Sequence, residues 1–315
     1  MMGRWDFLDS DFHRDAERGQ SIEGTKKERV STDVSVGRGP TDGSGPSLPE
    51  RNERILEQPA ERSPEQRIQY RIEERSYSLR SSEIAAMTDL GKFRTIDVQD
   101  LARFVYGGNE KRLNCDLKKL RSQGLIQEKT LFRAHKTPRK LLTLTAIGKQ
   151  ILGKTSDLPM EQRIYHGFVK QKELDHDADL YKVYQNAADE IREKGGRPTR
   201  VRLDFEMRGS IKRAKGTARP QAGDERERFL EAVAEDHGLT IRGKSIYLPD
   251  IQIEYQTREG TVERQNLELV SCNYREAGIR GKAAAGFKLY VRSGDAGRVR
   301  RALHDTGMVR EVLSV

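Results

Sequence analysis

The chain has 315 residues, 34% of them charged and 35% hydrophobic, and it carries a net charge of +9. This polar composition indicates that part of the chain does not fold into a core. No apolar run approaches the roughly 20 residues that span a bilayer, and the first residues lack the apolar core of a signal peptide. Two cysteines are too few for a disulfide framework. We therefore expect a cytoplasmic protein with no membrane contact.

The positive charge is concentrated in one stretch of the chain. Between Arg80 and Thr155 there are 16 Lys or Arg against 7 Asp or Glu, a net of +9 that equals the excess of the whole chain. A local excess of this kind attracts polyanions, nucleic acid first. The competing interpretation is a solvated basic surface without a partner.

Residues 1–68 are expected to form a disordered tail. Five of the ten prolines fall there, and the few apolar residues follow no helical or strand period. The mixed charges of residues 61–76 indicate a frayed helix that leads into the first folded domain.

Residues 79–155 show the pattern of three helices followed by two strands. Apolar spacing predicts a helix from Leu79 to Leu90 and a second one capped by Thr95. Asn109 caps a third helix over residues 110–123, which ends at Gly124. Strand patterns at 125–132 and 140–145 flank a basic turn, and a short helix follows. This order resembles a winged helix-turn-helix domain.

The third helix separates apolar from basic side chains. Leu113, Leu117 and Leu120 share one face, and the opposite face is basic. In winged-helix proteins such a helix enters the major groove, while the wing grips the flanking backbone. An amphipathic helix with a solvated basic face is the alternative, and some winged helices bind proteins. The candidate DNA-binding residues are Lys111, Arg112, Asn114, Lys118, Lys119 and Arg121 in the helix, with Arg133, Lys136, Arg139 and Lys140 in the wing.

Residues 160–196 are expected to form a helical connector, with a helix over 161–194. His176 lies among Asp175, Asp177 and Asp179. A metal site is one interpretation, and an acidic helix start that interacts well with the helix dipole is the simpler one.

Residues 199–315 read as an α/β domain with a mixed sheet, because helices and strands alternate. If Gly260 is left-handed in a three-residue hairpin loop, Thr257 pairs with Thr261 and Asp250 lies opposite Glu268. Two facing carboxylates repel unless a proton, a lysine or a shared cation separates them.

The same segment resembles the restriction-endonuclease-like core. Pro249-Asp250 and Glu268-Leu269-Val270 match its two motif elements, with Val270 where lysine is expected. The resemblance implies that Asp250 and Glu268 hold Mg²⁺, and that Lys282 or Lys288 replaces the missing lysine. The candidate catalytic set is therefore Asp250, Glu268 and Lys282, with Asp250 and Glu268 as metal ligands. A degenerate, inactive nuclease fold and a hairpin with two exposed acids are the alternatives.

Taken together, the two halves resemble the replication-relaxation family of plasmids and other mobile elements. His176-Asp177, Pro249-Asp250, Glu268-Leu269 and the segment 281–287 carry this resemblance. It implies an α+β chain: a disordered tail, a winged helix, and a restriction-endonuclease-like α/β domain.

We therefore expect a protein that binds double-stranded DNA in plasmid replication or DNA relaxation and is more a binding protein than an enzyme. A homodimer and contacts with replication or conjugation proteins fit this role. Three alternatives stay open: a transcription regulator with a dimerising or ligand-sensing C-terminal half, a Mg²⁺-dependent nuclease, and a module that binds proteins only.

Overall fold

The computed structural model describes residues 66–72, 74–133, 136–155, 158–217, 224–242, 245–271, 274–303 and 309–313. Residues 1–65 of the predicted tail therefore lie outside the described residues. From there the chain forms an antiparallel hairpin of β1 (Ile68–Ile72) and β2 (Arg75–Leu79), in which Ile68 pairs with Leu79. The helix predicted over 61–76 is wrong where the structure describes it. Tyr77 and Leu79 are buried and Ser76 is exposed, which is the period of two of a strand.

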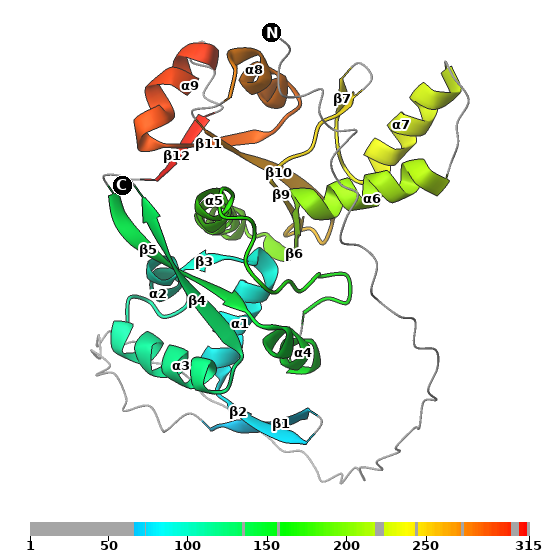
Figure 1. The fold of residues 1–315 in the computed structure, drawn as a ribbon. Helices are drawn as coiled ribbons and strands as arrows, with labels where there is room; N and C mark the ends of the chain where they lie inside the picture. Colours follow the sequence, from blue (N-terminus) through cyan, green and yellow to red (C-terminus); the bar gives the residue numbers. More distant parts are fainter. Residues whose placement is uncertain are drawn as a thin grey trace, which may run out of the picture. The chain divides into compact units, whose positions relative to one another are not determined.

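The next elements follow the order predicted for a winged helix, with one short strand added (Figure 1). The three strands form one antiparallel sheet in the order β3-β5-β4. Asp97, and not Thr95, caps the second helix, because its carboxylate accepts a hydrogen bond from the backbone N–H of Gln99. The elements are α1 (Ser81–Phe93), β3 (Ile96–Asp97), α2 (Val98–Phe104), α3 (Glu110–Ser122), β4 (Ile126–Arg133), β5 (Lys136–Leu144) and α4 (Ala146–Thr155).

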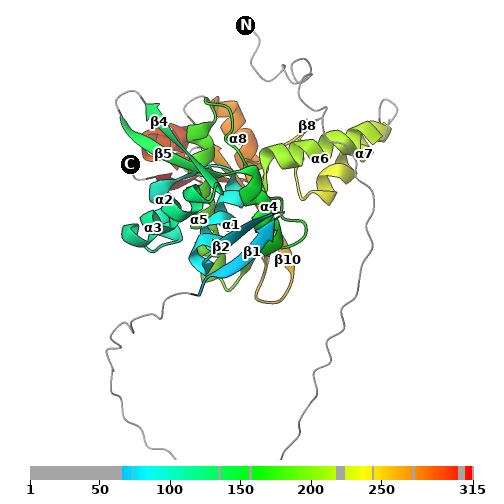
Figure 2. The same cartoon turned by 60° about the horizontal axis from the view of Figure 1, so that its bottom comes forward.

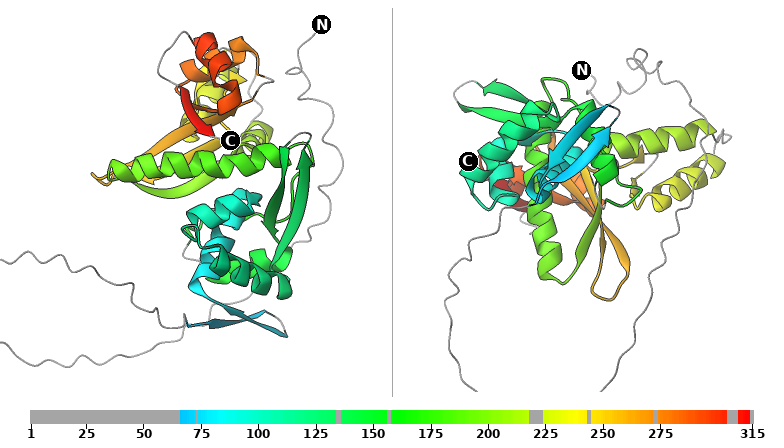
Figure 3. Two further views of the ribbon diagram at one scale, coloured as in Figure 1. Left: turned by 90° about the vertical axis from the view of Figure 1, so that its left-hand side faces the viewer. Right: turned by 90° about the horizontal axis from the view of Figure 1, so that it is seen from below.

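The connector contains one long helix, α5 (Leu174–Glu193). It begins later than the sequence predicts, because residues 158–173 are not α-helical in the structure. Figure 3 shows α5 between the winged helix and the C-terminal sheet. The Tyr181 ring packs edge-on against Phe93 of α1 and Phe104 of α2. A single apolar core runs from the winged helix through α5 to the C-terminal sheet.

The C-terminal sheet has five strands in the order β12-β11-β10-β9-β6. Pairs β10-β11 and β11-β12 are parallel, whereas β9-β10 and β6-β9 are antiparallel, so the predicted mixed sheet is confirmed. β12 had no counterpart in the sequence analysis. The bounds are β6 (Arg197–Leu203), β9 (Ile251–Gln256), β10 (Val262–Val270), α8 (Glu276–Ala284), β11 (Lys288–Arg292), a 3-10 turn (Ser293–Asp295), α9 (Ala296–Leu303) and β12 (Val309–Leu313).

Two further helices, α6 (Asp204–Thr217) and α7 (Asp224–Asp236), extend away from the sheet (Figure 2). They pack through a small apolar cluster of their own that includes Met207, Ile211 and Val233. A short two-stranded ribbon, β7 (Ile241–Arg242) with β8 (Ser245–Ile246), follows them. No helix among the described residues has the length and apolar composition that a membrane span needs.

Candidate functional site

The third helix is built as the sequence predicts. The Asn109 side chain accepts a hydrogen bond from the backbone N–H of Arg112 at 3.0 Å, which satisfies one of the donors left free at a helix start. Leu113, Leu117 and Leu120 are buried in the core. Gly124 closes the helix with a φ of 71°, a left-handed conformation that glycine adopts at low cost.

Four of the six contact residues predicted in α3 lie on its outer surface. Lys111, Asn114, Lys118 and Arg121 are exposed. Arg121 is partly engaged, because its guanidinium lies 2.6 Å from the Glu128 carboxylate of β4. The other two members of the helix set, Arg112 and Lys119, are half-buried. The helix therefore offers a basic outer face with a polar amide among its cations.

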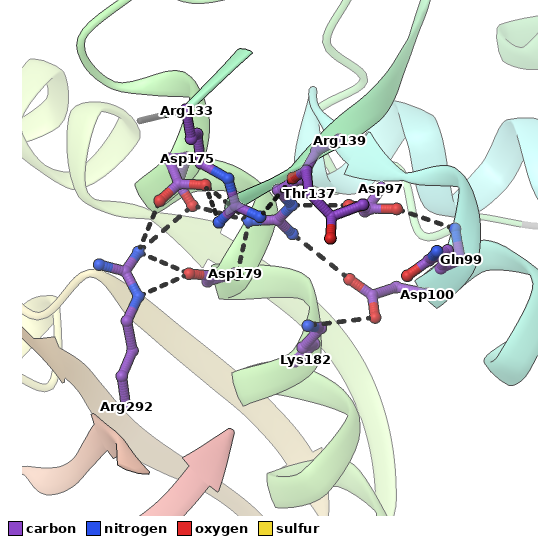
Figure 4. Close-up of polar contacts among 10 residues, drawn as sticks. All are labelled: Asp97, Gln99, Asp100, Arg133, Thr137, Arg139, Asp175, Asp179, Lys182 and Arg292. Atoms are coloured by element: carbon purple, nitrogen blue, oxygen red, sulfur yellow. Dashed lines mark hydrogen bonds and ion pairs between the residues drawn. The ribbon is translucent and has the colours of Figure 1, made fainter. Parts of the chain in front are cut away.

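The wing departs from the prediction. Arg139 was expected on DNA, but its side chain is only 7% exposed and points into the molecule (Figure 4). It lies 2.6 Å from Asp97 and 2.9 Å from both Asp175 and Asp179. An arginine held by buried carboxylates cannot also bind phosphate at the surface, so this assignment is wrong.

Arg139 is the centre of a balanced cluster, which we call the Arg139 cluster. Arg133 of the wing lies 3.2 Å from Asp175, so it too faces α5 in this structure. Arg292 of β11 lies 2.5 Å from Asp179. Four basic and four acidic side chains meet here: Arg133, Arg139, Lys182 and Arg292 with Asp97, Asp100, Asp175 and Asp179.

The electrostatics of the cluster favour a locked, charged arginine. Although burial opposes its charge, the carboxylates of Asp179 and Asp97 hold the pKa of Arg139 above its ordinary value. Burial raises the pKa of Asp100 to about 6, against the pull of Lys182. The cluster joins β3, α2, the wing, α5 and β11, and therefore fixes the wing against the rest of the molecule.

Lys140, which follows Arg139 in β5, is exposed and pairs with Thr130 of β4. Among the predicted wing contacts whose side chains the structure describes, Lys140 is the one that is exposed, and Lys129 of β4 is a further exposed wing cation. Lys136 lies at the start of β5, and its side chain is outside the described features.

The second candidate site lies at the end of the β9-β10 hairpin. The predicted register is confirmed from Val262, opposite Gln256, to Leu267, opposite Ile251. Gly260 has the expected left-handed φ of 86°. Beyond the last pair, the Asp250 backbone N–H donates to the Glu268 carboxylate at 3.2 Å. The two acids are therefore adjacent, as the register requires.

The structure also brings Lys282 to this pair. Its ammonium lies 2.8 Å from the Glu268 carboxylate and donates to the Leu248 carbonyl. Lys288, the other lysine considered, pairs with Glu190 instead. On the Asp250 side, the His176 imidazole lies 3.5 Å from the carboxylate. We define the Asp250 cluster as Asp250, Glu268, Lys282, His176 and Tyr274.

The two carboxylates titrate differently. Burial raises the pKa of Glu268 to about 7, and the Asp250 charge acts in the same direction. Burial acts to raise the pKa of Asp250 as well, but the charge of His176 outweighs it and holds the pKa of Asp250 below its ordinary value. Burial lowers the pKa of His176, yet Asp250 and Asp177 outweigh it and raise that pKa to about 11. Asp250 and His176 thus form a charged pair at neutral pH.

The donor set of the Asp250 cluster does not fit Mg²⁺. Glu268 is fully buried, and its oxygens accept hydrogen bonds from the Tyr274 hydroxyl and the Asp250 N–H. The Lys282 ammonium supplies the positive charge that a metal ion would otherwise bring. Among the described residues no three His, Cys, Asp or Glu side chains are grouped to hold a metal ion.

Sequence reasoning missed the acids that bind Arg139 and the hydroxyl of Tyr274. One signal was present: Asp175 and Asp179 are four residues apart and lie on one face of a helix. A basic partner for that face could have been sought, but its place in the wing depends on tertiary structure.

No protein-family model matches the chain, and no curated protein is significantly similar to it. The replication-relaxation family, which the sequence resembles, is therefore not found by either comparison. A solved structure that is similar is the crystal structure of Bacillus subtilis PadR in complex with operator DNA. It is 18% identical, with 50% of this chain and 93% of that chain covered and a TM-score of 0.21. A score this low assigns no fold, so the winged-helix assignment depends on the order and pairing of the chain's own elements.

Proposed function

We propose that this protein binds duplex DNA by placing α3 in the major groove. The observation that carries the proposal is the outer face of α3, where Lys111, Asn114 and Lys118 are exposed while the leucine face is buried. Lysine binds phosphates, and asparagine is suited to the edge of adenine. Lys140 on the wing adds a backbone contact.

The biological role is part of the same proposal. The resemblance to the replication-relaxation family implies plasmid replication or DNA relaxation in a mobile element. A transcription regulator is the runner-up, and a palindromic site with two half-sites would favour it, because such symmetry reflects a protein dimer.

We further propose that the C-terminal sheet domain does not cleave the DNA that α3 binds. The Asp250 cluster supports this, because Glu268 is buried and already bound to Lys282. In this proposal the cluster stabilises the junction of α5, β9, β10 and α8.

The test is binding of the full chain to a labelled duplex, measured over a range of salt concentrations. In the double variant Lys111→Ala/Lys118→Ala we expect weaker binding and a log Kd against log salt slope reduced by roughly 2, since about one counterion is released per phosphate contact. A matched control removes two exposed lysines elsewhere, Lys172→Ala/Lys212→Ala, and should leave the slope unchanged.

In the same experiment, plasmid DNA incubated with the protein and Mg²⁺ should shift and stay intact. Nicking that disappears in Asp250→Ala would establish the nuclease instead. An unchanged salt slope in the α3 double variant would remove α3 from the interface.

A further inference from the structure

The wing carries an unusually exposed aromatic side chain. Phe132 is 78% exposed, and it is the aromatic member of the exposed large hydrophobic residues among the described part of the chain. An exposed phenylalanine contributes nothing to the core and leaves its apolar area in contact with water.

The backbone of β4 aims this side chain outward. The register shifts between Leu131, which pairs with Arg139, and Arg133, which pairs with Lys136. An irregularity of this kind in an antiparallel pair redirects the side chain at that point. Leu131 packs toward α5 in a cluster with Leu141, so the alternation of the strand places Phe132 on the opposite face.

The exposed residues that share that face with Phe132 are polar, and one of them is a lysine. Thr130 pairs with Lys140, and both are exposed. Closer to the base of the wing, Glu128 of the same strand binds Arg121 of α3 at 2.6 Å. The outer wing face, defined as Thr130, Phe132 and Lys140, is thus joined to the basic face of α3.

The wing arginines do not serve this face. Arg139 is buried, and Arg133 lies against Asp175, so both are turned toward α5. On this face the wing presents an aromatic ring two residues along β4 from the Thr130–Lys140 pair. Phosphate and ribose offer little to such a ring, whereas the bases offer apolar faces and edges.

We propose that Phe132 is a base-contacting residue of this protein, which packs against a base step from the minor groove beside the major groove that α3 occupies. This inference rests on the proposed function of α3. Lys140 would bind the adjacent phosphate and hold the ring at the groove. Apolar wedges of this kind partly unstack a base step and bend the duplex.

The experiment compares wild type, Phe132→Ala and Phe132→Leu on a 30-bp duplex, roughly three helical turns, labelled with a fluorophore pair at its ends. We expect Phe132→Ala to weaken binding about tenfold, the size of one lost base–aromatic contact. The salt slope should not change, because no phosphate contact is lost. Wild type should shorten the end-to-end distance of the duplex, and the alanine variant should not. Phe132→Leu should retain part of both effects.

Val262→Ala is the matched control, since Val262 is 70% exposed on a hairpin of the C-terminal sheet. It should bind and bend DNA as wild type does. The inference is overturned if Phe132→Ala binds and bends as wild type while the α3 double variant loses affinity, and the proposed function then stands. If Phe132→Ala binds DNA normally but loses a dimer seen by light scattering, the face is a protein contact and the inference is also overturned. If wild type does not bind the duplex at low salt, the proposed function itself fails.

Discussion

The exposed lysines of α3 and the arginines of the wing differ in what surrounds them. Lys111 and Lys118 lie at the surface, whereas Arg139 is buried among carboxylates. All three belong to the segment that holds the positive excess of the chain. The difference comes from α5, which presents Asp175 and Asp179 to the wing from 36 and 40 residues away in sequence. A charge count therefore locates a basic segment but not which of its cations are available to a partner.

The strongest way to break this comparison is to remove the buried arginine. Arg139→Met leaves four carboxylates close together without their central cation, and we expect it to lower the free energy of unfolding by about 3–5 kcal/mol. Urea unfolding at pH 7 measures this. The neighbouring exposed residue provides the control, since Lys140→Met should change stability by less than about 0.5 kcal/mol. A stable Arg139→Met variant with weakened DNA binding would restore Arg139 to the DNA interface.

A second, intermediate effect concerns pH and the Asp250 cluster. Because Asp250 and Asp177 raise the pKa of His176 to about 11, folding retains a proton that the unfolded chain releases near pH 6.5. The stabilisation is complete below pH 6.5 and is lost as the pH rises toward 11. Urea midpoints should therefore fall from pH 7 to pH 9 in wild type, and fall less in His176→Gln.

His237 provides the matched control for that measurement. Burial, with Arg202, lowers the pKa of His237, so its protonation differs between the folded and unfolded states only below about pH 6.5. His237→Gln should keep the wild-type decline above pH 7. Identical profiles for wild type and His176→Gln would show that His176 and Asp250 are not coupled in solution.

The smallest effect sharpens the comparison from the surface side. Lys118→Ala should leave the urea midpoint nearly unchanged, within about 0.5 kcal/mol in unfolding free energy, because Lys118 is exposed and its removal opens no cavity in the core. The same variant should reduce the salt slope of DNA binding by roughly 1. A loss of stability without a change in slope would place Lys118 in a structural contact.

The sequence was sufficient where local rules determine the structure. The α3 boundaries follow from the Asn109 cap and Gly124, and the β9-β10 register follows from the short loop around Gly260. For the lysine beside Glu268 the sequence left both Lys282 and Lys288 open. The contact between α8 and the sheet decides for Lys282, and that contact has no local sequence signal.

Other features depend on distant parts of the chain. The β1-β2 hairpin is held by Arg67, which binds the buried Glu83 at 2.8 Å, and by Gln123, which accepts from the Ser78 N–H. Neither contact has a local signature. The burial of Arg139 likewise requires the carboxylates of α5. The wing sequence alone therefore predicts an exposed basic turn.

The shared apolar core has a consequence for how this protein can be divided. Phe93 of α1 and Phe104 of α2 are covered by Tyr181 of α5, which also belongs to the core under the C-terminal sheet. A fragment cut after the winged helix would expose these aromatic rings and leave Arg139 without two of its acids. The winged helix is therefore not a removable module, because α5 joins it to the C-terminal sheet through the apolar core and the carboxylates of Asp175 and Asp179.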